Sequence, residues 1–424
     1  MGKVSLFHVS KTLSERISDS SFVQKAKKIA TAFIRNRKMP FCDIIYFIIS
    51  CTNRSLQTEL DEYFHKKGCD PVSRQAFSKS RENIKYEAFI DLNDLLVQKF
   101  EEDDSKIETY RGYRLFSADG TLIDLPNTVP LREHFGFSSN GTDKEYAKGL
   151  AMTAFDVLNK ITVFAELYRY DDSEKLRILD IVDGFAKLYS EKNIWLLDRG
   201  YPSFELFHRL NENSQNFVIR VSSQSLKEIN EANEADQTIT ITRGFRSIEL
   251  RVVNIALSSG TSEKLVTNLF ADFAPGDFRE LYCLRWEIET NYRFLKNKVC
   301  VEVFTGESIT AVLQDFHSSI LVLNMAAISE REQKEILLKN NAVCSSGKNT
   351  GCSYSPNKTK LIAAIKRDFV KLMLCEKKTN RVFRQFLLIR NIKRYAYLDI
   401  PGRAFPRNFT INKSRRSAHP KSAF

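Results

Sequence analysis

The feature that most constrains the fold is an alternation of strand-like and helix-like segments that begins near residue 111. Short stretches with alternating or continuous apolar residues favour strands at 111–119, 149–157, 161–168, 193–198 and 216–222. Apolar residues at helical spacing occur between the later stretches, at 173–191 and 203–212. A chain patterned in this way predicts an α/β domain, in which helices cover a sheet.

The region before this domain follows a different pattern. Residues 1–105 have apolar residues at helical spacing, which predicts a helical N-terminal domain. Its segment 69–84 contains Arg74, Lys79 and Arg81. The segment is therefore either a DNA-reading helix or an ordinary solvated helix, and the residues alone favour neither.

The net charge of +12 is distributed unevenly along the chain. Residues 340–424 contain 19 Lys or Arg and 3 Asp or Glu, a net +16, and the remaining 339 residues carry −4. A segment this basic favours polyanionic partners. We expect the tail at 401–424 to be disordered until it binds such a partner.

Several classes of protein fit the sequence poorly. The eight cysteines include no C-x-x-C pair, which disfavours a structural zinc site. The longest apolar run, 41–51, contains Asp43 and is too short to cross a bilayer, so we expect no membrane partner. No secretory signal is recognisable, and reduced thiols in a cytoplasmic protein are the default expectation.

Three acidic residues stand where an α/β fold can build a site. Asp119 and Asp198 end predicted strands, where the turning backbone exposes the last side chain. Glu289 lies on a long helix predicted to start after 275–278. Hard oxygen ligands suit a pair of Mg²⁺ ions about 3.5–4 Å apart, and Mn²⁺ is equally compatible. Each acid taken alone is more often a turn, cap or solvated residue.

The same predicted helix has an unusual polar side. Tyr282, Arg285, Glu289 and Lys296 fall within about 60° of one another around the helix axis. A carboxylate beside two cations and a phenol is uncommon on a core face, and it suits one wall of a phosphate site.

Residues next to the second aspartate support the same interpretation. Arg199 and Arg285 can each place a guanidinium fork on phosphate oxygens. Tyr201 and Tyr282 can position a DNA strand by stacking or hydrogen bonding. The cluster as a whole therefore predicts a site that binds phosphates beside metal ions.

These motifs resemble a known family. The spacing Tyr282-x2-Arg285-x3-Glu289-x6-Lys296 matches the YREK signature of the DDE transposases of bacterial insertion sequences, the IS-four type. Asp198-Arg199-Gly200-Tyr201 and segment 117–121 look like its two aspartate motifs. Three strand-favouring stretches within 223–270 are similar to the insertion that splits its RNase H-like domain. The resemblance covers roughly residues 110–330 and implies a mixed sheet with flanking helices.

The resemblance also implies how the chain is divided. The expected parts are a helical DNA-binding domain at 1–105, the two parts of the RNase H-like domain at 106–222 and 271–340, the β-rich insertion at 223–270, and a basic C-terminal region at 341–424. The N-terminal domain is expected to read the terminal repeat of the element. The basic region is expected to add dimer contacts and non-specific DNA affinity.

A transposase of this kind would work on double-stranded DNA with two Mg²⁺ ions held by Asp119, Asp198 and Glu289. Water activated at the metal site would cut the element ends, and the freed 3′ hydroxyl would attack target DNA. Because two ends must meet, a homodimer on DNA is expected, in the cytoplasm of a bacterium and at its nucleoid. The residues expected to grip the end near the cut are Tyr282, Arg285 and Lys296.

Excision in this family typically passes through a DNA hairpin. In related enzymes an aromatic residue of the insertion, often Trp, accommodates a flipped base at that step. The two tryptophans here, Trp195 and Trp286, both lie outside the insertion. Phe245 is the candidate that could replace such a residue by stacking.

Two other interpretations remain open. Segment 119–124, DGTLID, resembles the D-x-D-G-T motif of haloacid-dehalogenase phosphatases, but Ser117 stands where those enzymes need a nucleophilic Asp. Alternatively, the chain is a DNA-binding descendant of a transposase that has lost its chemistry, since a basic tail alone binds DNA through counterion release. Loss of cutting with retained DNA binding in Asp198→Ala would favour catalysis.

Overall fold

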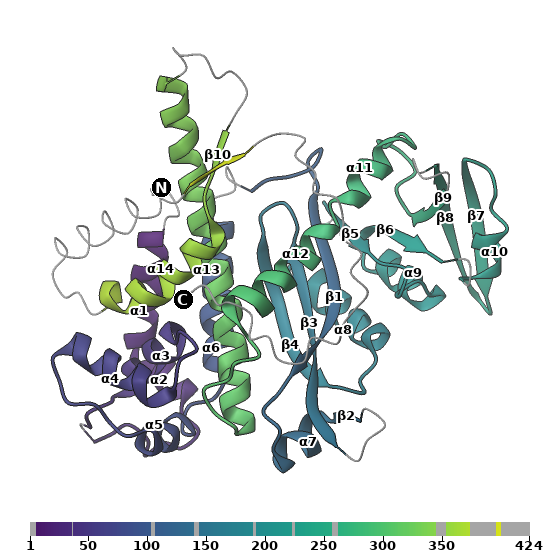
Figure 1. The fold of residues 1–424 in the computed structure, drawn as a ribbon. Coiled ribbons are helices and arrows are strands. Elements are labelled where there is room, and N and C mark those ends of the chain that lie inside the picture. Colours follow the sequence, from purple (N-terminus) through teal and green to yellow (C-terminus); the bar gives the residue numbers. More distant parts are fainter. Residues whose placement is uncertain are drawn as a thin grey trace. The chain divides into compact units, whose positions relative to one another are not determined.

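The computed structural model describes residues 6–35, 37–102, 107–139, 144–189, 192–222, 225–256, 262–344, 353–373 and 396–399. Packing divides the chain into two compact units. We call residues 105–292 the sheet unit, and residues 1–104 together with 293–424 the helical unit. The elements of both units are labelled in Figure 1.

The sheet unit is built around a nine-stranded sheet with the order β2-β3-β1-β5-β6-β9-β8-β7, in which β4 pairs with β3 (Figure 1). β1 is antiparallel to β3 and parallel to β5, and β5 is parallel to β6. The predicted mixed sheet is therefore confirmed. The strands are β1 (Arg114–Asp124), β2 (Phe137–Ser139), β3 (Glu145–Asp156), β4 (Ile161–Arg169), β5 (Asn193–Leu197), β6 (Asn216–Val221), β7 (Asp236–Arg243), β8 (Arg246–Ala256) and β9 (Ser262–Thr267).

Helices cover this sheet and complete its core. All residues of β5 are buried, as expected for a central strand with both faces covered. α8 (Glu174–Ala186) packs against β1 and β3, and α9 (Phe204–Glu212) packs against β6. Ser203 caps α9 by accepting the amide N–H of Leu206. Shorter helices are α7 (Val129–Phe135) and α10 (Lys227–Asn230). The core between them includes Phe116, Phe185, Trp195, Phe207 and Phe217.

The β-rich stretch expected at 223–270 continues the main sheet. β9 pairs antiparallel with β6, β8 pairs with β9, and β7 pairs with β8. The β7–β8 hairpin closes through Gly244-Phe245, where Gly244 has φ +59°, a conformation that glycine adopts without strain. The side chain of Phe245 at this tip is fully exposed.

The helix expected to start after 275–278 is not continuous. The amide N–H groups of Arg285 and Ile288 bond three residues back, to the carbonyl oxygens of Tyr282 and Arg285, so the backbone is wound more tightly there. The prediction of one unbroken helix is therefore wrong. The elements observed are α11 (Asp277–Cys283), α12 (Trp286–Phe294) and a π-helical turn, η2 (Leu295–Val299).

The helical unit combines helices from both ends of the chain. α13 packs against α3, α6 and α14 (Figure 1). The buried amides of Asn93 and Asn324 join α6 to α13 at 2.7 Å. Its helices are α1 (Leu6–Ser18), α2 (Ser20–Ala26), α3 (Phe41–Ser50), α4 (Leu56–Lys67), α5 (Arg74–Arg81), α6 (Glu87–Glu101), α13 (Ile309–Cys344) and α14 (Lys358–Met373), and a short strand pair is formed by β10 (Ser353–Ser355) and β11 (Tyr397–Asp399).

Several local expectations for this unit need correction. Apolar residues at helical spacing over 21–34 favour one helix there, but α2 ends at Ala26, because Lys27 adopts an extended conformation. α1 and α4 lie within the region 1–105 that was predicted to be helical. The tail at 401–424 lies outside the described residues. The two units are defined by packing, and the expected division of the chain into five parts with different roles remains a prediction.

Arg81 is part of the interior of the helical unit. Its side chain is 1% exposed, and its guanidinium donates to Gln314 at 2.8 Å, Thr305 at 2.8 Å and Asp315 at 2.7 Å. A fourth hydrogen bond, from Nη2 to the carbonyl oxygen of Ala311 at 3.2 Å, completes the set. Arg81 is therefore unavailable to read DNA, and that part of the interpretation of 69–84 is wrong.

One helix is long and apolar enough to be considered as a membrane span. It covers Ile309–Glu335 of α13, with a mean hydropathy of 1.3 in its most apolar window. Within that window, 89% of the residues are buried inside the protein. A helix buried inside a protein passes the same test as a membrane span, and the packing of α13 against other helices, including α3, α6 and α14, accounts for its apolar composition.

Candidate active site

Two of the predicted acids belong to neighbouring parts of the sheet. In the parallel register of β1 and β5, Phe116 pairs with Trp195. The pairing ends there, and three residues further along each chain stand Asp119, in β1, and Asp198, one residue past the end of β5. Both acids interact electrostatically with Arg285, which places them in one cluster although they are 79 positions apart in the sequence.

The local setting of each aspartate differs from the sequence expectation in one respect. Asp198 directly follows Leu197, the last residue of β5, as predicted. Asp119 lies within β1, which continues to Asp124 because β3 pairs with it along the whole stretch. The turn predicted at Asp119-Gly120 is therefore wrong, because Asp119 stands inside a continuous strand.

Two tyrosine hydroxyls hold these carboxylates. The Tyr282 hydroxyl donates to Oδ1 of Asp198 at 3.3 Å. The Tyr201 hydroxyl lies 3.2 Å from Oδ1 of Asp119 and 3.1 Å from Oε2 of Glu174. Both rings are buried, so the stacking role on DNA considered for Tyr201 and Tyr282 does not fit. Their contacts instead fix the orientation of the acids.

A buried guanidinium lies among the acids. Arg285 has a side chain that is 4% exposed, and it donates to Oε1 of Glu289 at 2.9 Å. It also interacts electrostatically with Asp198 and Asp119. Among the described residues, the Nε atom of Arg285 is buried and has no hydrogen-bond partner. The arginine therefore retains one donor that an added anion can use.

The electrostatics of the site are dominated by burial. The pKa of Asp119 is raised to about 6, chiefly by burial and also by the nearby charge of Glu174, while the N–H of Gly120 and the charge of Arg285 oppose the rise. Burial also raises the pKa of Tyr201, with help from the charges of Asp119 and Glu174. The ionised form of Asp119 is thus disfavoured here and would be stabilised by an added cation.

The pKa of Arg285 is raised, although burial by itself would lower it. Burial alone lowers the pKa, but Tyr282, Asp198 and Glu289 around the guanidinium raise it beyond its ordinary value. The guanidinium therefore stays charged and neutralises part of the acidic cluster. The aromatic rings of Tyr282 and Trp286 lie 5.7 and 5.4 Å from the guanidinium carbon, which adds cation–π contacts.

Sequence reasoning missed three residues of the site. Glu174, the first residue of α8, contacts Tyr201, and its carboxyl group lies so close to Gly120 that an added Cβ would meet it at 2.7 Å. The Tyr292 hydroxyl donates to the carbonyl oxygen of Asp119 at 2.5 Å and accepts from Thr153 at 2.9 Å. Tyr292 follows Glu289 by three residues, so helical spacing was an available signal, whereas Glu174 offered none.

The donor chemistry of the site suits a divalent cation. Hard carboxylate oxygens are the ligands that Mg²⁺ prefers, and one or two carboxylates with water suffice for it. Asp119 and Asp198 are the carboxylates of the cluster that could supply such ligands. Glu289 is bonded to Arg285, and the described residues contain no group of three or more His, Cys, Asp or Glu side chains close enough to hold an ion.

The remaining predicted residues lie in different places. Arg199 is exposed just after Asp198. Phe245 is fully exposed at the tip of the β7–β8 hairpin, which is fixed by ion pairs of Arg243 with Glu228 and Arg246 with Glu205. Lys296 belongs to η2 in the helical unit, where it lies 3.9 Å from Glu302. Its expected place beside the three acids stays a prediction.

Ser117 occupies the position that the phosphatase interpretation requires for a nucleophile. It is buried, and its hydroxyl donates to the carbonyl oxygen of Leu196 at 2.7 Å, which ties β1 to β5 just before the two acids. A hydroxyl in this role joins two strands and does not form an aspartyl-phosphate. The haloacid-dehalogenase interpretation therefore gains no support from the site.

Comparison with known proteins places this sheet and its acidic cluster in a family. Residues 110–325 match the family described as the Transposase DDE domain, and the chain belongs to this family. Among solved structures, the chain is similar to a piggyBac transposase in a synaptic complex with hairpin DNA. The identity is 14% and the TM-score 0.44, over 94% of this chain and 86% of that chain. No curated protein matches the sequence.

Proposed function

We propose that this protein is a transposase of the IS-four type that cuts the ends of an insertion-sequence element and joins them to target DNA. The observation that supports this most strongly is that Asp119 of β1 and Asp198, just after the neighbouring strand β5, both interact with the buried guanidinium of Arg285. Tyr282, Arg285 and Glu289, from the YREK signature, contact or surround these two acids. Membership of the transposase family makes DNA the expected substrate.

We infer an RNase H-like fold for the catalytic part of the sheet unit. Five strands in the order β4-β3-β1-β5-β6 support it, with antiparallel pairs on one side of β1 and parallel pairs on the other. β7, β8 and β9 then form the insertion that separates β6 from α11 and α12. In this arrangement the insertion lengthens the catalytic sheet instead of forming a separate domain.

The proposed cofactor is a pair of Mg²⁺ ions, with Mn²⁺ as a substitute, held by Asp119, Asp198 and, by family resemblance, Glu289. Such ions supply charge stabilisation to the attacking and leaving oxygens of a phosphodiester. The protein itself contributes the orientation of the ligands. The hydroxyl of Tyr201 orients Asp119, and the hydroxyl of Tyr282, on α11, orients Asp198.

Arg285 has the properties of a phosphate-binding residue in this proposal. It is buried and charged, and its Nε has no partner among the described residues. A DNA phosphate next to the acids would receive a donor that is already positioned, and a preorganised donor is worth more in a buried site than in water. Arg199 and Lys296 are proposed to add exposed and half-buried cations to the same strand of DNA.

Other parts of the chain are proposed to bind the DNA outside the cut. The N-terminal helices would read the terminal repeat, and the basic C-terminal region would add non-specific affinity. Two chains would hold the two ends as a homodimer. Phe245 is proposed to stack on a flipped base if excision passes through a hairpin, since its ring is fully exposed at a rigid tip.

The test is an incubation of the full-length protein with linear DNA that carries the sequences flanking its gene at both ends. Products are separated on a denaturing gel after reaction with Mg²⁺ or with EDTA. We expect nicks, hairpins and joined products with Mg²⁺ only. Asp198→Ala should abolish all of them and keep DNA binding. Asp180→Asn, at an exposed position of α8, is the matched control and should cut normally. Cutting by Asp198→Ala at the normal rate would contradict the proposal.

A further inference from the structure

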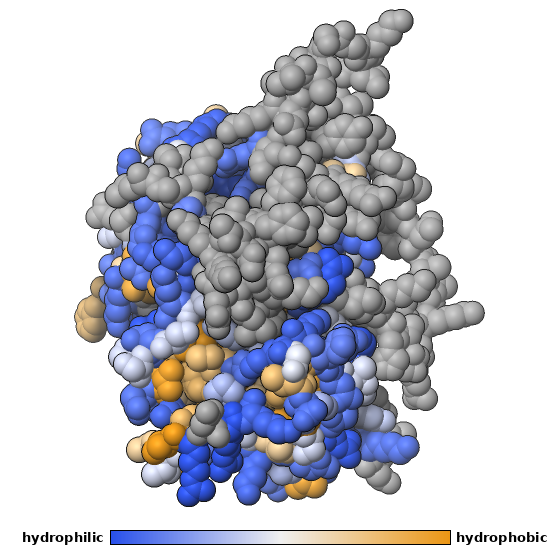
Figure 2. Space-filling model, turned by 90° about the vertical axis from the view of Figure 1, so that its left-hand side faces the viewer, coloured by the Kyte–Doolittle hydropathy of each residue, from blue (hydrophilic) through white to orange (hydrophobic). Residues whose placement is uncertain are grey.

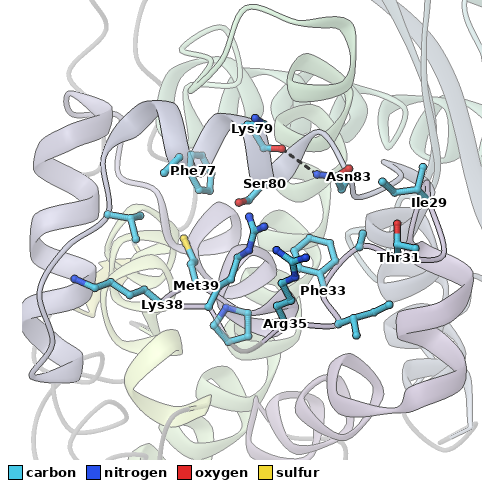
Figure 3. A pocket seen from close by; sticks show the side chains of 16 residues that line it. Ile29, Thr31, Phe33, Arg35, Lys38, Met39, Phe77, Lys79, Ser80 and Asn83 are labelled. Carbon is cyan, nitrogen blue, oxygen red and sulfur yellow. Dashed lines mark hydrogen bonds between the residues drawn. The ribbon is translucent and has the colours of Figure 1, made fainter.

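A basic hollow in the helical unit is separate from the acidic site. It lies between the loop that follows α2 and the exposed face of α5, and its volume is about 800 Å³. Figure 3 shows Phe33, Arg35 and Met39 of the loop on one side of it and Phe77 and Ser80 of α5 on the other. The size is in the range of about 300–1,000 Å³ that is usual for pockets that bind small molecules or parts of larger ones.

The interior of the hollow is apolar. Phe77 and Met39 are buried beneath it, and Phe77 stacks edge-on with Phe47 of the core at 4.7 Å. Ile29 and Ile34 in the same lining are 53% and 68% exposed, an unusual degree of exposure for isoleucine. Figure 2 shows the face that carries the N-terminal helices, where hydrophobic groups lie among hydrophilic ones. These apolar surfaces are unfavourable in contact with water, so they suit an apolar part of a ligand that would cover them.

The loop is held in a conformation that costs free energy. Phe33 has φ +58°, a left-handed backbone that an aromatic residue rarely adopts. Its ring packs edge-on against Phe41, with 5.6 Å between the ring centres. Such strained residues persist only where surrounding contacts impose them, and they occur often at binding sites. The loop therefore has a defined shape before any ligand arrives.

The charge of the hollow has one sign. Its lining includes four cations, Arg35, Arg37, Lys38 and Lys79, and no carboxylate. Lys38 lies 3.7 Å from the exposed Asp70. Arg35, Arg37 and Lys79 are exposed and, among the residues that the structure describes, form no ion pair. Three unneutralised cations around an apolar hollow complement a ligand that combines several negative charges with flat apolar groups.

We infer that this hollow binds a DNA strand at an unpaired nucleotide, with its phosphates on Arg35, Arg37 and Lys79 and its base against Phe33 and Ile34. Guanidinium forks match phosphate oxygens, and every base has a flat face that stacks on apolar or aromatic side chains. The backbone of a regular duplex would use the cations but leave the apolar hollow empty. The inference rests on the proposed function, because it assumes that DNA is the ligand.

The experiment measures binding of fluorescein-labelled 20-nucleotide DNA to the full-length protein by anisotropy, in EDTA so that no cutting occurs. The probes are a single strand, a perfect duplex, and a duplex with one unpaired thymidine. For the variant Arg35→Glu/Arg37→Glu/Lys79→Glu we expect binding of the single strand to weaken at least tenfold. The slope of log K against log salt should become about 2 units shallower, since three phosphate contacts are lost.

A second variant and a control separate the parts of the inference. Ile34→Ala, at an exposed position, should remove most of the preference for the unpaired thymidine over the perfect duplex. Lys227→Glu in the sheet unit also reverses an exposed positive charge. The affinity of this variant for each DNA probe should stay within twofold of that of the wild type. Circular dichroism melting checks that each variant is folded.

The outcomes also distinguish this inference from the proposed function. If the wild type cuts element ends but the triple variant binds every probe as tightly as the control, the inference about the hollow is wrong and the proposed function stands. If the triple variant loses binding but no cutting is found with Mg²⁺, the hollow binds DNA and the transposase proposal fails. Equal weakening for single strand and perfect duplex would overturn the assignment of an unpaired nucleotide.

Discussion

A buried arginine lies beside a carboxylate in each unit, Arg81 in the helical unit and Arg285 in the sheet unit, and these two are bonded to different degrees. In the helical unit, Arg81 makes four hydrogen bonds, three to side chains and one to a carbonyl oxygen. In the sheet unit, Arg285 donates to Glu289 and keeps Nε without a partner among the described residues. A satisfied buried cation fixes the packing of helices, whereas a partly satisfied one is prepared for an anionic ligand.

The arginines of the basic hollow extend this comparison to the surface. Arg35 and Arg37 are exposed and unpaired among the described residues, so their charges are available without rearrangement but are screened by salt. The same type of side chain is thus suited to packing, to the proposed catalysis or to the proposed DNA affinity according to its burial and its partners. Variants at the three kinds of position should therefore change different measurements.

The largest effect on stability is expected for Arg81→Ala. The change removes all four hydrogen bonds and leaves the 11% exposed carboxylate of Asp315 without its cation. Breaking a buried pair in this way costs about 3–5 kcal/mol of the free energy of unfolding. Urea denaturation of the full chain measures it. A loss below about 1 kcal/mol would show that the network contributes little to packing, and the comparison with Arg285 would lose its basis.

The next effect comes from Asp119→Asn and depends on pH. The pKa of Asp119 is raised to about 6 by burial, so the folded chain binds a proton there more readily than the unfolded chain, whose pKa is near 3.8. Stability contributed by this proton is present below pH 3.8 and is lost as pH rises through 6. Without metal, Asp119→Asn should therefore be more stable than the wild type at pH 7, by up to about 3 kcal/mol, and equal to it near pH 3.5.

Denaturation of both proteins in EDTA at the two pH values measures this difference. Asp171→Asn, at an exposed position whose carboxylate pairs with Arg169, is the control and should show no such gain. A variant less stable than the wild type at pH 7 would mean that the ionised carboxylate is well tolerated in its surroundings.

Arg285→Ala should affect catalysis more than folding. Loss of one preorganised charged donor typically lowers the rate by about 10²-fold, equivalent to about 2.7 kcal/mol in the transition state. Its acidic partners are partly exposed and can be hydrated, so stability should fall less than for Arg81→Ala. Single-turnover cutting with Mg²⁺ tests this, with Arg209→Ala on α9 as a control. Similar losses of stability in Arg81→Ala and Arg285→Ala, with normal cutting by the latter, would remove the distinction between them.

The smallest effect is expected for Tyr201→Phe. The change removes the hydroxyl between Asp119 and Glu174 while the ring still fills its buried place. We expect a loss of about 1 kcal/mol in stability. The pKa of Asp119 should rise further, because the hydroxyl now lowers it, so the pH profile of cutting should shift upward. Tyr146→Phe, at an exposed position of β3, should leave the profile unchanged.

The sequence predicted the elements of the sheet unit well because their signals are local. The apolar runs of β4, β5 and β6 and the helical spacing of α8 and α9 are readable within a few residues. The position of Asp119 inside β1 could not be predicted, because Gly120 is a local signal for the end of a strand. β1 continues past Gly120 only because β3 pairs with it there. Strand register is a property of two distant segments, and no local pattern contains it.

The site was predicted in part for the same reason. Asp198, Arg285 and Glu289 could be chosen from motif spacing, but Glu174 entered the site only through the packing of α8 on β1. Arg81 shows the reverse error, since a basic residue on an exposed-looking helix was assigned to the surface and lies in the core. Burial of a charge depends on partners from α13, more than 200 residues away.

The most direct test of the central claim is a count of Mn²⁺ ions bound to the full-length protein, followed by the electron paramagnetic resonance signal of free Mn²⁺. If Asp119 and Asp198 form the metal site, the wild type should bind two ions with DNA present, and Asp198→Asn should bind at least one fewer while Asp180→Asn binds both. Equal Mn²⁺ binding by the wild type and Asp198→Asn would contradict the account.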